Sequence, residues 1–195
     1  MKKGISIIII LIVFQNAKPQ LPDEQMKFSG GMMCHTGYIQ NNRSIQKLSG
    51  ICYGIGGQMT FSYRSNVRAG LEGYASNFKY RGQEGYYKLG WGGLLLGYQV
   101  SDKRLHPVVS LTLGGGKIRD LFFVEGSTSD DEIDRVIYRK YPVMLISPSI
   151  SAEYSLKSKL TLVMKLDYVL PIFSLHRSDY ANGPRLYLGI LFNRG

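Results

Sequence analysis

The chain has 195 residues, carries 24 Lys and Arg against 14 Asp and Glu, and has a formal net charge of +10. This length fits one domain after a leader segment is removed. The basic residues are scattered through predicted loops and strand ends, and no recognition module accompanies them, so the charge does not indicate a nucleic-acid partner.

The N-terminus has the features of an export signal. Lys2 and Lys3 give a positive start, and residues 5–14 are apolar except for Ser6. This run is shorter than the roughly 18 to 20 residues that span a bilayer as a helix, and Ala17 offers a small residue for cleavage. An uncleaved anchor is the alternative. The predicted division is a signal peptide over 1–17, an N-terminal segment over 18–25 and one folded domain over 26–195.

Eight segments after the leader alternate apolar with polar or small residues. In the clearest, from Leu160 to Leu170, every second residue is Leu, Met or Tyr, whereas Lys165 and Asp167 lie on the other face. A period of two is the period of a β-strand, because successive side chains point to opposite faces. Apolar residues outside and charges inside are typical of a membrane-spanning barrel. The predicted strands are Met26–Ile39, Ser49–Tyr63, Asn66–Phe78, Tyr86–Val100, Pro107–Phe123, Pro142–Leu156, Leu160–Phe173 and Pro184–Phe192.

The connections between these segments alternate in length. Short turns follow the second, fourth and sixth predicted strands, and longer polar segments follow the first, third, fifth and seventh. This is the arrangement of bacterial outer-membrane barrels, with turns in the periplasm and loops outside the cell. The third long segment, Val124–Tyr141, is acidic, but its carboxylates lack the spacing of an EF-hand calcium loop, so we interpret it as a solvated loop. Those carboxylates are Glu125, Asp130, Asp131, Glu132 and Asp134.

The sequence therefore predicts an all-β protein, an eight-stranded antiparallel up-and-down transmembrane β-barrel. A barrel of this size is only wide enough for its own side chains to fill. Inward charges of both signs should pair, because a lone buried charge costs several kcal/mol, and the lumen is then a scaffold and not a pore. The predicted polar network of the lumen comprises Arg68, Glu72, Lys88, Glu153, Lys165, Asp167 and Arg185. The predicted lipid-facing residues are Ile51, Tyr53, Ile55, Met59, Phe61, Val67, Ala69, Leu71, Met144, Ile146, Ile150, Tyr154, Leu186, Leu188, Ile190 and Phe192.

Two cysteines, Cys34 and Cys52, fall in consecutive predicted strands. One hairpin register sets them opposite each other and would allow a disulfide in an oxidising compartment. Shifting that register by one residue pairs Met32 with Ile55, groups the apolar residues better and sends the two sulfur atoms to opposite faces. We predict the second register and no disulfide.

The last predicted strand, from Gly183 to Phe192, alternates and ends on an aromatic residue. With the eight-strand pattern, it resembles the small eight-stranded outer-membrane β-barrel proteins, the OmpA transmembrane-domain and OmpX-like group often labelled porin-family. The resemblance covers nearly everything after the leader. It implies a monomer in the bacterial outer membrane, surrounded by lipid and lipopolysaccharide and inserted by the barrel-assembly machinery, with Phe192 as the aromatic residue of the assembly signal. The departure is that Asn193, Arg194 and Gly195 follow this aromatic residue.

The resemblance implies a non-enzymatic barrel that displays loops for adhesion, defence or partner binding, without cofactor or metal. One alternative is a lipid A-modifying enzyme, because His176 two residues before Ser178 is similar to the His and Ser of lipid A deacylase barrels. Those barrels also use a Glu further along, and no Glu follows Ser178. A second alternative is a soluble lipocalin-like carrier of small apolar ligands, which would place its apolar residues inside. A third is a narrow channel, which needs a lumen that the inward charges leave open.

Overall fold

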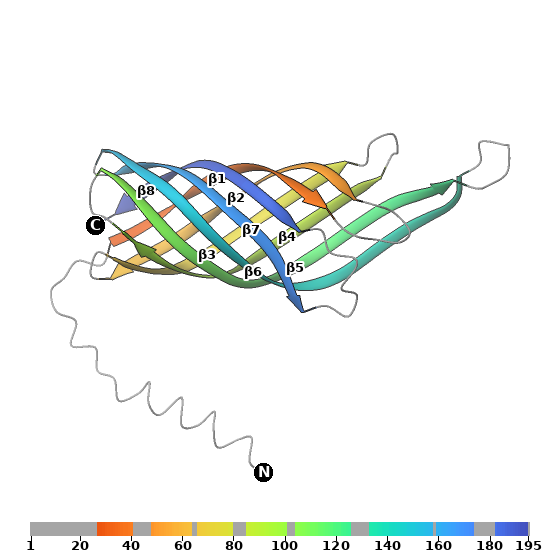
Figure 1. The fold of residues 1–195 in the computed structure, drawn as a ribbon, viewed down its shortest axis with the longest axis horizontal. Coiled ribbons are helices and arrows are strands. Elements are labelled where there is room, and N and C mark those ends of the chain that lie inside the picture. The colour runs from red at the N-terminus through yellow and green to blue at the C-terminus, as the bar shows by residue number, and fades with distance from the viewer. Residues whose placement is uncertain are drawn as a thin grey trace, which may run out of the picture.

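Eight antiparallel strands close into one barrel in the computed structural model, in which each strand pairs with its sequence neighbour and β8 pairs back with β1 (Figure 1). The strands are β1 (Lys27–Gln40), β2 (Ser49–Tyr63), β3 (Val67–Lys79), β4 (Tyr86–Gln99), β5 (Leu105–Glu125), β6 (Ile133–Lys157), β7 (Leu160–Phe173) and β8 (Gly183–Arg194). The eight-stranded all-β fold predicted from the sequence is confirmed.

The structure describes residues 27–40, 48–63, 66–79, 85–100, 104–125, 133–157, 159–173 and 182–194. The predicted signal peptide and N-terminal segment, over residues 1–25, lie outside these ranges, as do residues 126–132 of the predicted acidic loop. In the described residues, no helix has the length and hydropathy needed to cross a membrane.

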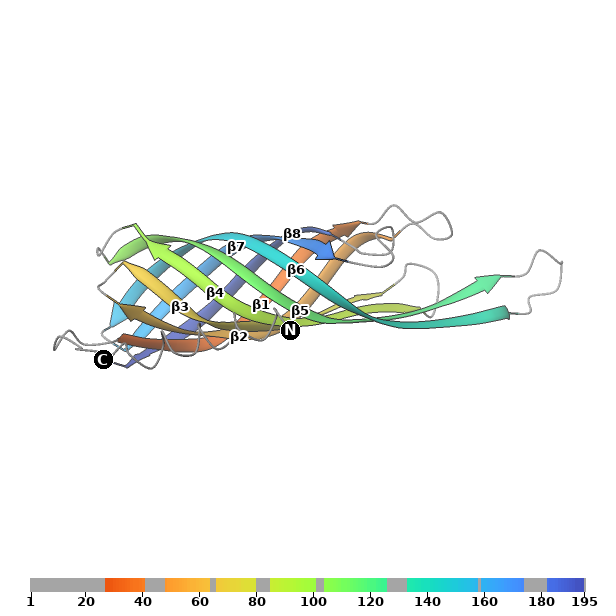
Figure 2. The same cartoon turned by 90° about the horizontal axis from the view of Figure 1, so that it is seen from below.

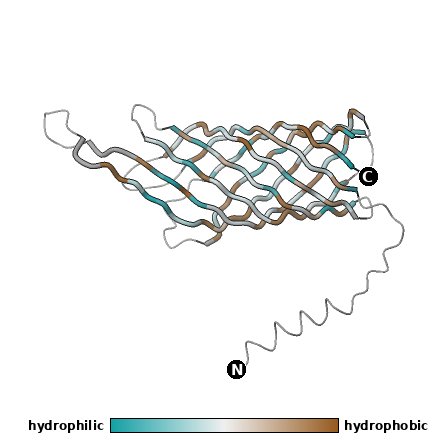
Figure 3. Tube along the Cα trace, turned by 180° about the vertical axis from the view of Figure 1, so that it is seen from behind, coloured by the Kyte–Doolittle hydropathy of each residue, from teal (hydrophilic) through white to brown (hydrophobic). Residues whose placement is uncertain are grey.

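Strict alternation explains why each strand has two different faces. In β7, Lys165 and Asp167 are buried, whereas Leu166 between them and Tyr168 after them are exposed on the outside of the wall. Hydrophobic and hydrophilic positions alternate along the strands in the same way (Figure 3). All the predicted lipid-facing residues lie on the exposed side, and Ile146 among them is half-buried. The outer wall therefore carries an apolar band around the barrel, as a membrane-spanning barrel requires.

The two ends of the barrel differ. At one end, three short turns join β2 to β3, β4 to β5 and β6 to β7, and the C-terminal end of β8 lies at this same end (Figure 1). We call this the turn side and the opposite end the loop side. At the loop side, β5 with 21 residues and β6 with 25 residues run on together beyond the other strands (Figures 1 and 2). The predicted loop Val124–Tyr141 is therefore wrong at both of its ends, because residues 124–125 belong to β5 and residues 133–141 belong to β6.

The β1–β2 hairpin has the predicted parity but a different register. Cys34 lies opposite Ile55, and Met32 lies opposite Gly57, so the predicted Met32–Ile55 pairing is off by two residues. Because a shift by two keeps every side chain on its own face, Cys34 is exposed and Cys52 is buried, and both are free cysteines.

Close contact between neighbouring strands explains one of the inward glycines. A Cβ atom at Gly31 would lie 1.9 Å from the carbonyl oxygen of Ile190 on β8. No side chain can be accommodated at that distance, so the curvature of the wall between β1 and β8 depends on glycine at this position.

Candidate functional site

The lumen is the part of the barrel in which polar side chains gather. Of the seven residues predicted to form its polar network, the structure places six inside: Arg68, Glu72, Glu153, Lys165, Asp167 and Arg185 are all buried. Lys88 is exposed on the outer face, so its predicted inward position is wrong. The inward positions beside it in β4 are taken by Tyr87 and Leu89, whose side chains fill the lumen while the Lys88 ammonium reaches out.

A turn-side cluster joins four strands. Arg68 on β3 donates through Nη1 to Glu153 Oε2 on β6 at 2.7 Å, and through Nη2 to the side-chain carbonyl of Gln99 on β4. His106 on β5 lies 3.2 Å from the same oxygen of Glu153 through its Nε2. Hydrogen bonds from two partners offset the free-energy cost of removing the Glu153 carboxylate from water. The cluster therefore fills this end of the lumen with matched charges.

A central cluster forms around Glu72. Lys165 on β7 donates from Nζ to Glu72 Oε2, Thr112 on β5 donates to Oε1 at 2.5 Å, and the Tyr74 hydroxyl donates to Oε2 at 3.4 Å. The Lys165 ammonium also lies 5.4 Å and 5.3 Å from the ring centroids of Tyr74 and Tyr187. The ammonium is thus held by one carboxylate and two aromatic faces, which suits a desolvated cation.

A third cluster lies nearer the loop side. Arg185 on β8 donates to Ser76 Oγ at 3.1 Å, and the Ser76 hydroxyl lies 2.8 Å from His35 Nε2 on β1. Asp167 on β7 sits directly opposite Arg185 and accepts from Ser147 Oγ at 3.0 Å. Asp167 and Arg185 therefore put opposite charges at facing positions of two neighbouring strands.

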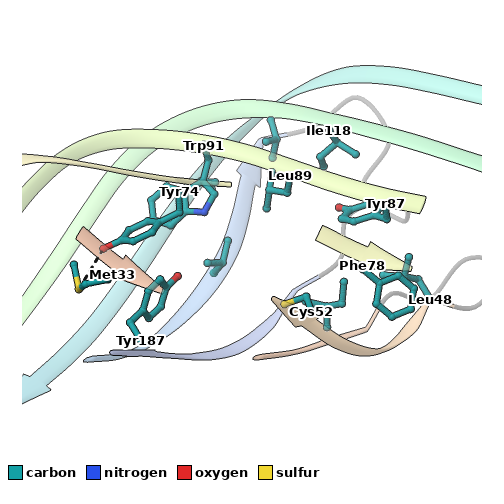
Figure 4. Packing of buried hydrophobic residues seen from close by; sticks show 14 of the residues in the cluster. Met33, Leu48, Cys52, Tyr74, Phe78, Tyr87, Leu89, Trp91, Ile118 and Tyr187 are labelled. Atoms are coloured by element: carbon teal, nitrogen blue, oxygen red, sulfur yellow. Dashed lines mark hydrogen bonds between the residues drawn. The ribbon is translucent and has the colours of Figure 1, made fainter. Parts of the chain in front are cut away.

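Above these polar clusters, apolar side chains close the loop side of the lumen. Leu48, Cys52, Phe78 and Tyr87 lie together there, and Leu89 and Ile118 lie nearby (Figure 4). This apolar closure was not predicted from the sequence, because only charged and polar residues were named for the lumen. The sequence of β4 could have indicated it, because Tyr87, Leu89 and Trp91 fall on the face opposite Leu94 and Leu96. A strand with apolar residues on both faces must turn one of them towards the lumen.

The lumen is packed through its middle. Arg185 is 1% exposed, Lys165 2% and Tyr187 0%, so these side chains are closed to solvent. The His35–Ser76 pair has the distance of a base and a nucleophile, but it is buried and His35 Nδ1 has no hydrogen-bond partner to orient the ring. The pair acts as a structural hydrogen bond.

The residues proposed for enzyme chemistry lie elsewhere. His176 and Ser178 fall in residues 174–181, outside the described residues. Within the described strands, no group of three or more His, Cys, Asp or Glu side chains is placed to hold a metal ion. Phe192, predicted as the aromatic residue of an assembly signal, is 63% exposed on the outer face near the end of β8.

Comparison with solved structures shows which known proteins share this fold. No protein-family model and no curated protein matches the sequence. Among solved structures, the attachment invasion locus protein Ail of Yersinia pestis superimposes with a TM-score of 0.60 at 8% identity, covering 87% of this chain and 99% of Ail. Neisserial surface protein A matches with a TM-score of 0.57 at 12% identity, covering 85% and 96%.

The outer membrane protein OprG of Pseudomonas aeruginosa matches with a TM-score of 0.53 at 12% identity, covering 87% of this chain and 96% of OprG. An apolar outer wall and a polar, ion-paired lumen place the barrel in a membrane, because only there is such an exterior stable. The protein has the fold of the small eight-stranded outer-membrane β-barrels, and its outer face is that of an integral protein of the bacterial outer membrane.

Proposed function

We propose that the protein is a non-enzymatic, monomeric scaffold of the outer membrane that presents the β5–β6 hairpin outside the cell to a partner. The observation that carries this proposal is the reach of the hairpin. Pairing with β4 ends at Tyr86 opposite Leu121, and pairing with β7 ends at Phe173 opposite Met144. Beyond those points, β5 and β6 pair only with each other among the described strands (Figure 2).

The packed lumen supports a scaffold over a channel. Three polar clusters and the apolar closure tie together strands that are not neighbours, such as β3 with β7 and β3 with β6. Such cross-links hold the wall rigid, and loops or hairpins on a rigid support are a common way of presenting a binding surface.

The name of one structural neighbour suggests the class of partner. Ail is described as an attachment and invasion protein, and attachment to a host-cell surface is the form of partner binding that we propose for this barrel. The proposal includes export by the predicted leader and insertion by the barrel-assembly machinery, for which Phe192 supplies the terminal aromatic residue.

The test is a shortened hairpin. Leu121 and Tyr138 lie directly opposite each other, so residues 122–137 can be replaced by Asn-Gly to form a tight two-residue turn. Bacteria carrying this variant should attach less to cultured epithelial cells than bacteria carrying the full protein. Both proteins must show equal amounts in the outer membrane and the same heat-dependent gel shift.

A second variant keeps the length of the hairpin. Val136→Thr with Tyr138→Thr removes two exposed apolar side chains and preserves strand propensity. Loss of attachment in both variants assigns the contact to these side chains, and loss only in the shortened variant assigns it to the hairpin as a whole. Undiminished attachment of the shortened variant would refute the proposal.

A further inference from the structure

Among the described side chains, negative charge is confined to the lumen side of the wall. The carboxylates whose side chains are described are all buried: Glu72, Asp120, Glu153 and Asp167. The exposed charged residues of the described strands and turns are all cations. On the loop side these are Lys79, Lys88, Lys117, Arg119 and Lys140, and on the turn side they are Lys27, Arg104, Lys159 and Arg194.

Four of the loop-side cations form a compact patch on the outer face of β4, β5 and β6. Lys88 lies directly opposite Arg119, and Arg119 lies directly opposite Lys140, so the three form one row across three strands. Lys117 is two residues from Arg119 on the same face of β5. We call these four residues the cationic row.

Like charges placed directly opposite each other on a sheet repel. Within the described part of the chain, none of the four forms an ion pair with a carboxylate. The Lys88 ammonium lies 4.7 Å from the centroid of the Tyr86 ring, which leaves its charge unneutralised. An external anion with several charges would relieve this repulsion.

The height of the row identifies where that anion lies. Lys88 and Lys117 are about 11 and 12 residues from the turn-side ends of their strands. With a rise of about 3.3 Å per residue and a tilt of about 40°, they lie about 28 to 30 Å above the turn side, just past an apolar band of about 25 Å. The row thus begins at the outer edge of the membrane, at the level of head groups.

Directly below the row, three outward positions of β4 and β5 are glycines, bordered on β6 by Pro142 and Met144. Gly90 lies directly opposite Lys117, and the next outward positions towards the turn side are Gly92 and Gly115, which lie opposite each other. A Cβ atom at Gly90 would meet nothing within 4 Å, so packing within the barrel does not require glycine there. The surface leaves room for acyl chains immediately below the cations.

We propose that the cationic row binds the phosphate groups of lipopolysaccharide in the outer leaflet, with the acyl chains of the lipid lying over the glycine surface. A phosphorylated glycolipid is the occupant that offers several phosphates at this height and apolar chains below them. This inference rests on insertion in the outer membrane and is independent of what the β5–β6 hairpin binds.

The test uses the protein purified from cell envelopes in detergent, stripped of lipid and titrated with fluorescently labelled lipopolysaccharide. The test variant changes all four residues of the row to Gln. The control variant makes the same four-charge change on the turn side, at Lys27, Arg104, Lys159 and Arg194. Each cation near a lipid surface contributes about fivefold in affinity, so the test variant should bind at least a hundredfold more weakly.

The control variant should bind as tightly as the unchanged protein, and lipopolysaccharide stripped of its lipid A phosphates should bind the unchanged protein as weakly as it binds the test variant. Four results would overturn the proposal: equal affinity of the test variant, equal losses in both variants, displacement by millimolar inorganic phosphate, or loss of binding to a sulfated glycan such as heparin with lipopolysaccharide binding unchanged. Because none of these readouts involves host cells, failure here is distinguishable from failure of the attachment proposal.

Discussion

Lys165 on β7 donates a hydrogen bond to Glu72 on β3 across the lumen, between strands that are not neighbours in the wall. Lys165 is 2% exposed and Glu72 4%, so neither charge is compensated by solvent. Each charge of this pair is thus compensated mainly by the other, so loss of the pair should lower the free energy of unfolding of the whole barrel.

Replacing Lys165 by Met leaves the Glu72 carboxylate buried without its cation. Breaking one side of a buried ion pair costs about 3–5 kcal/mol, whereas replacing both partners by apolar residues costs less. We expect Lys165→Met to lower the free energy of unfolding in urea by about that amount, and Lys165→Met with Glu72→Leu to recover part of it.

The matched control for that change is Lys79→Met, which removes an exposed cation on the outer face. It should alter the unfolding free energy by less than about 0.5 kcal/mol. An equally small effect of Lys165→Met would show that the buried pair does not stabilise the barrel.

Two separate layers close the lumen, and each should block ions. In planar bilayers the purified protein should give no stable conductance steps, because the side chains at the centre of the lumen are inaccessible to water. Phe78→Ala with Tyr87→Ala opens only the apolar layer, and this variant should also fail to conduct, since the Arg68 and Glu72 clusters remain below. Regular steps from the unchanged protein would contradict a packed lumen.

The sequence was sufficient to predict the strands because the membrane imposes a simple rule on them. Lipid on one side and a narrow lumen on the other force alternation, so β7 was predicted from Leu160 to Phe173, as observed. Residues 133–141 project beyond the band and carry cations and apolar residues on both faces, so no alternation marked them as strand.

Lys88 shows the limit of assigning faces from charge alone. A charged residue in mid-pattern was placed inside, but Lys88 lies near the loop-side end of β4, where the outer face already meets head groups. A polar residue can therefore face outwards at that height. The contacts between distant strands, such as Ser76 with His35 and with Arg185, depend on barrel closure and are not encoded in any local pattern.

Gly31 and Gly90 test which glycines the wall requires. A Cβ atom at Gly31 would lie 1.9 Å from the Ile190 carbonyl oxygen, whereas one at Gly90 would meet nothing within 4 Å. Gly31→Ala should therefore reduce the folded, heat-shifted fraction severalfold in detergent refolding, and Gly90→Ala should leave it unchanged. Equal refolding yields would mean that the β1–β8 contact can relax.

Phe192 lies on the outer face near the end of β8, directly opposite Leu160 on β7 and Gly30 on β1. If it serves as the aromatic residue of an assembly signal, Phe192→Ala should lower the amount of barrel in the outer membrane severalfold while refolding in detergent stays near that of the unchanged protein. Leu188→Ala, on the same face of the same strand, removes a comparable lipid contact away from the strand end and should leave the amount in cells unchanged. A parallel fall of both variants in cells and in detergent would instead mean that Phe192 acts through stability, because lost lipid contact affects folding in either setting.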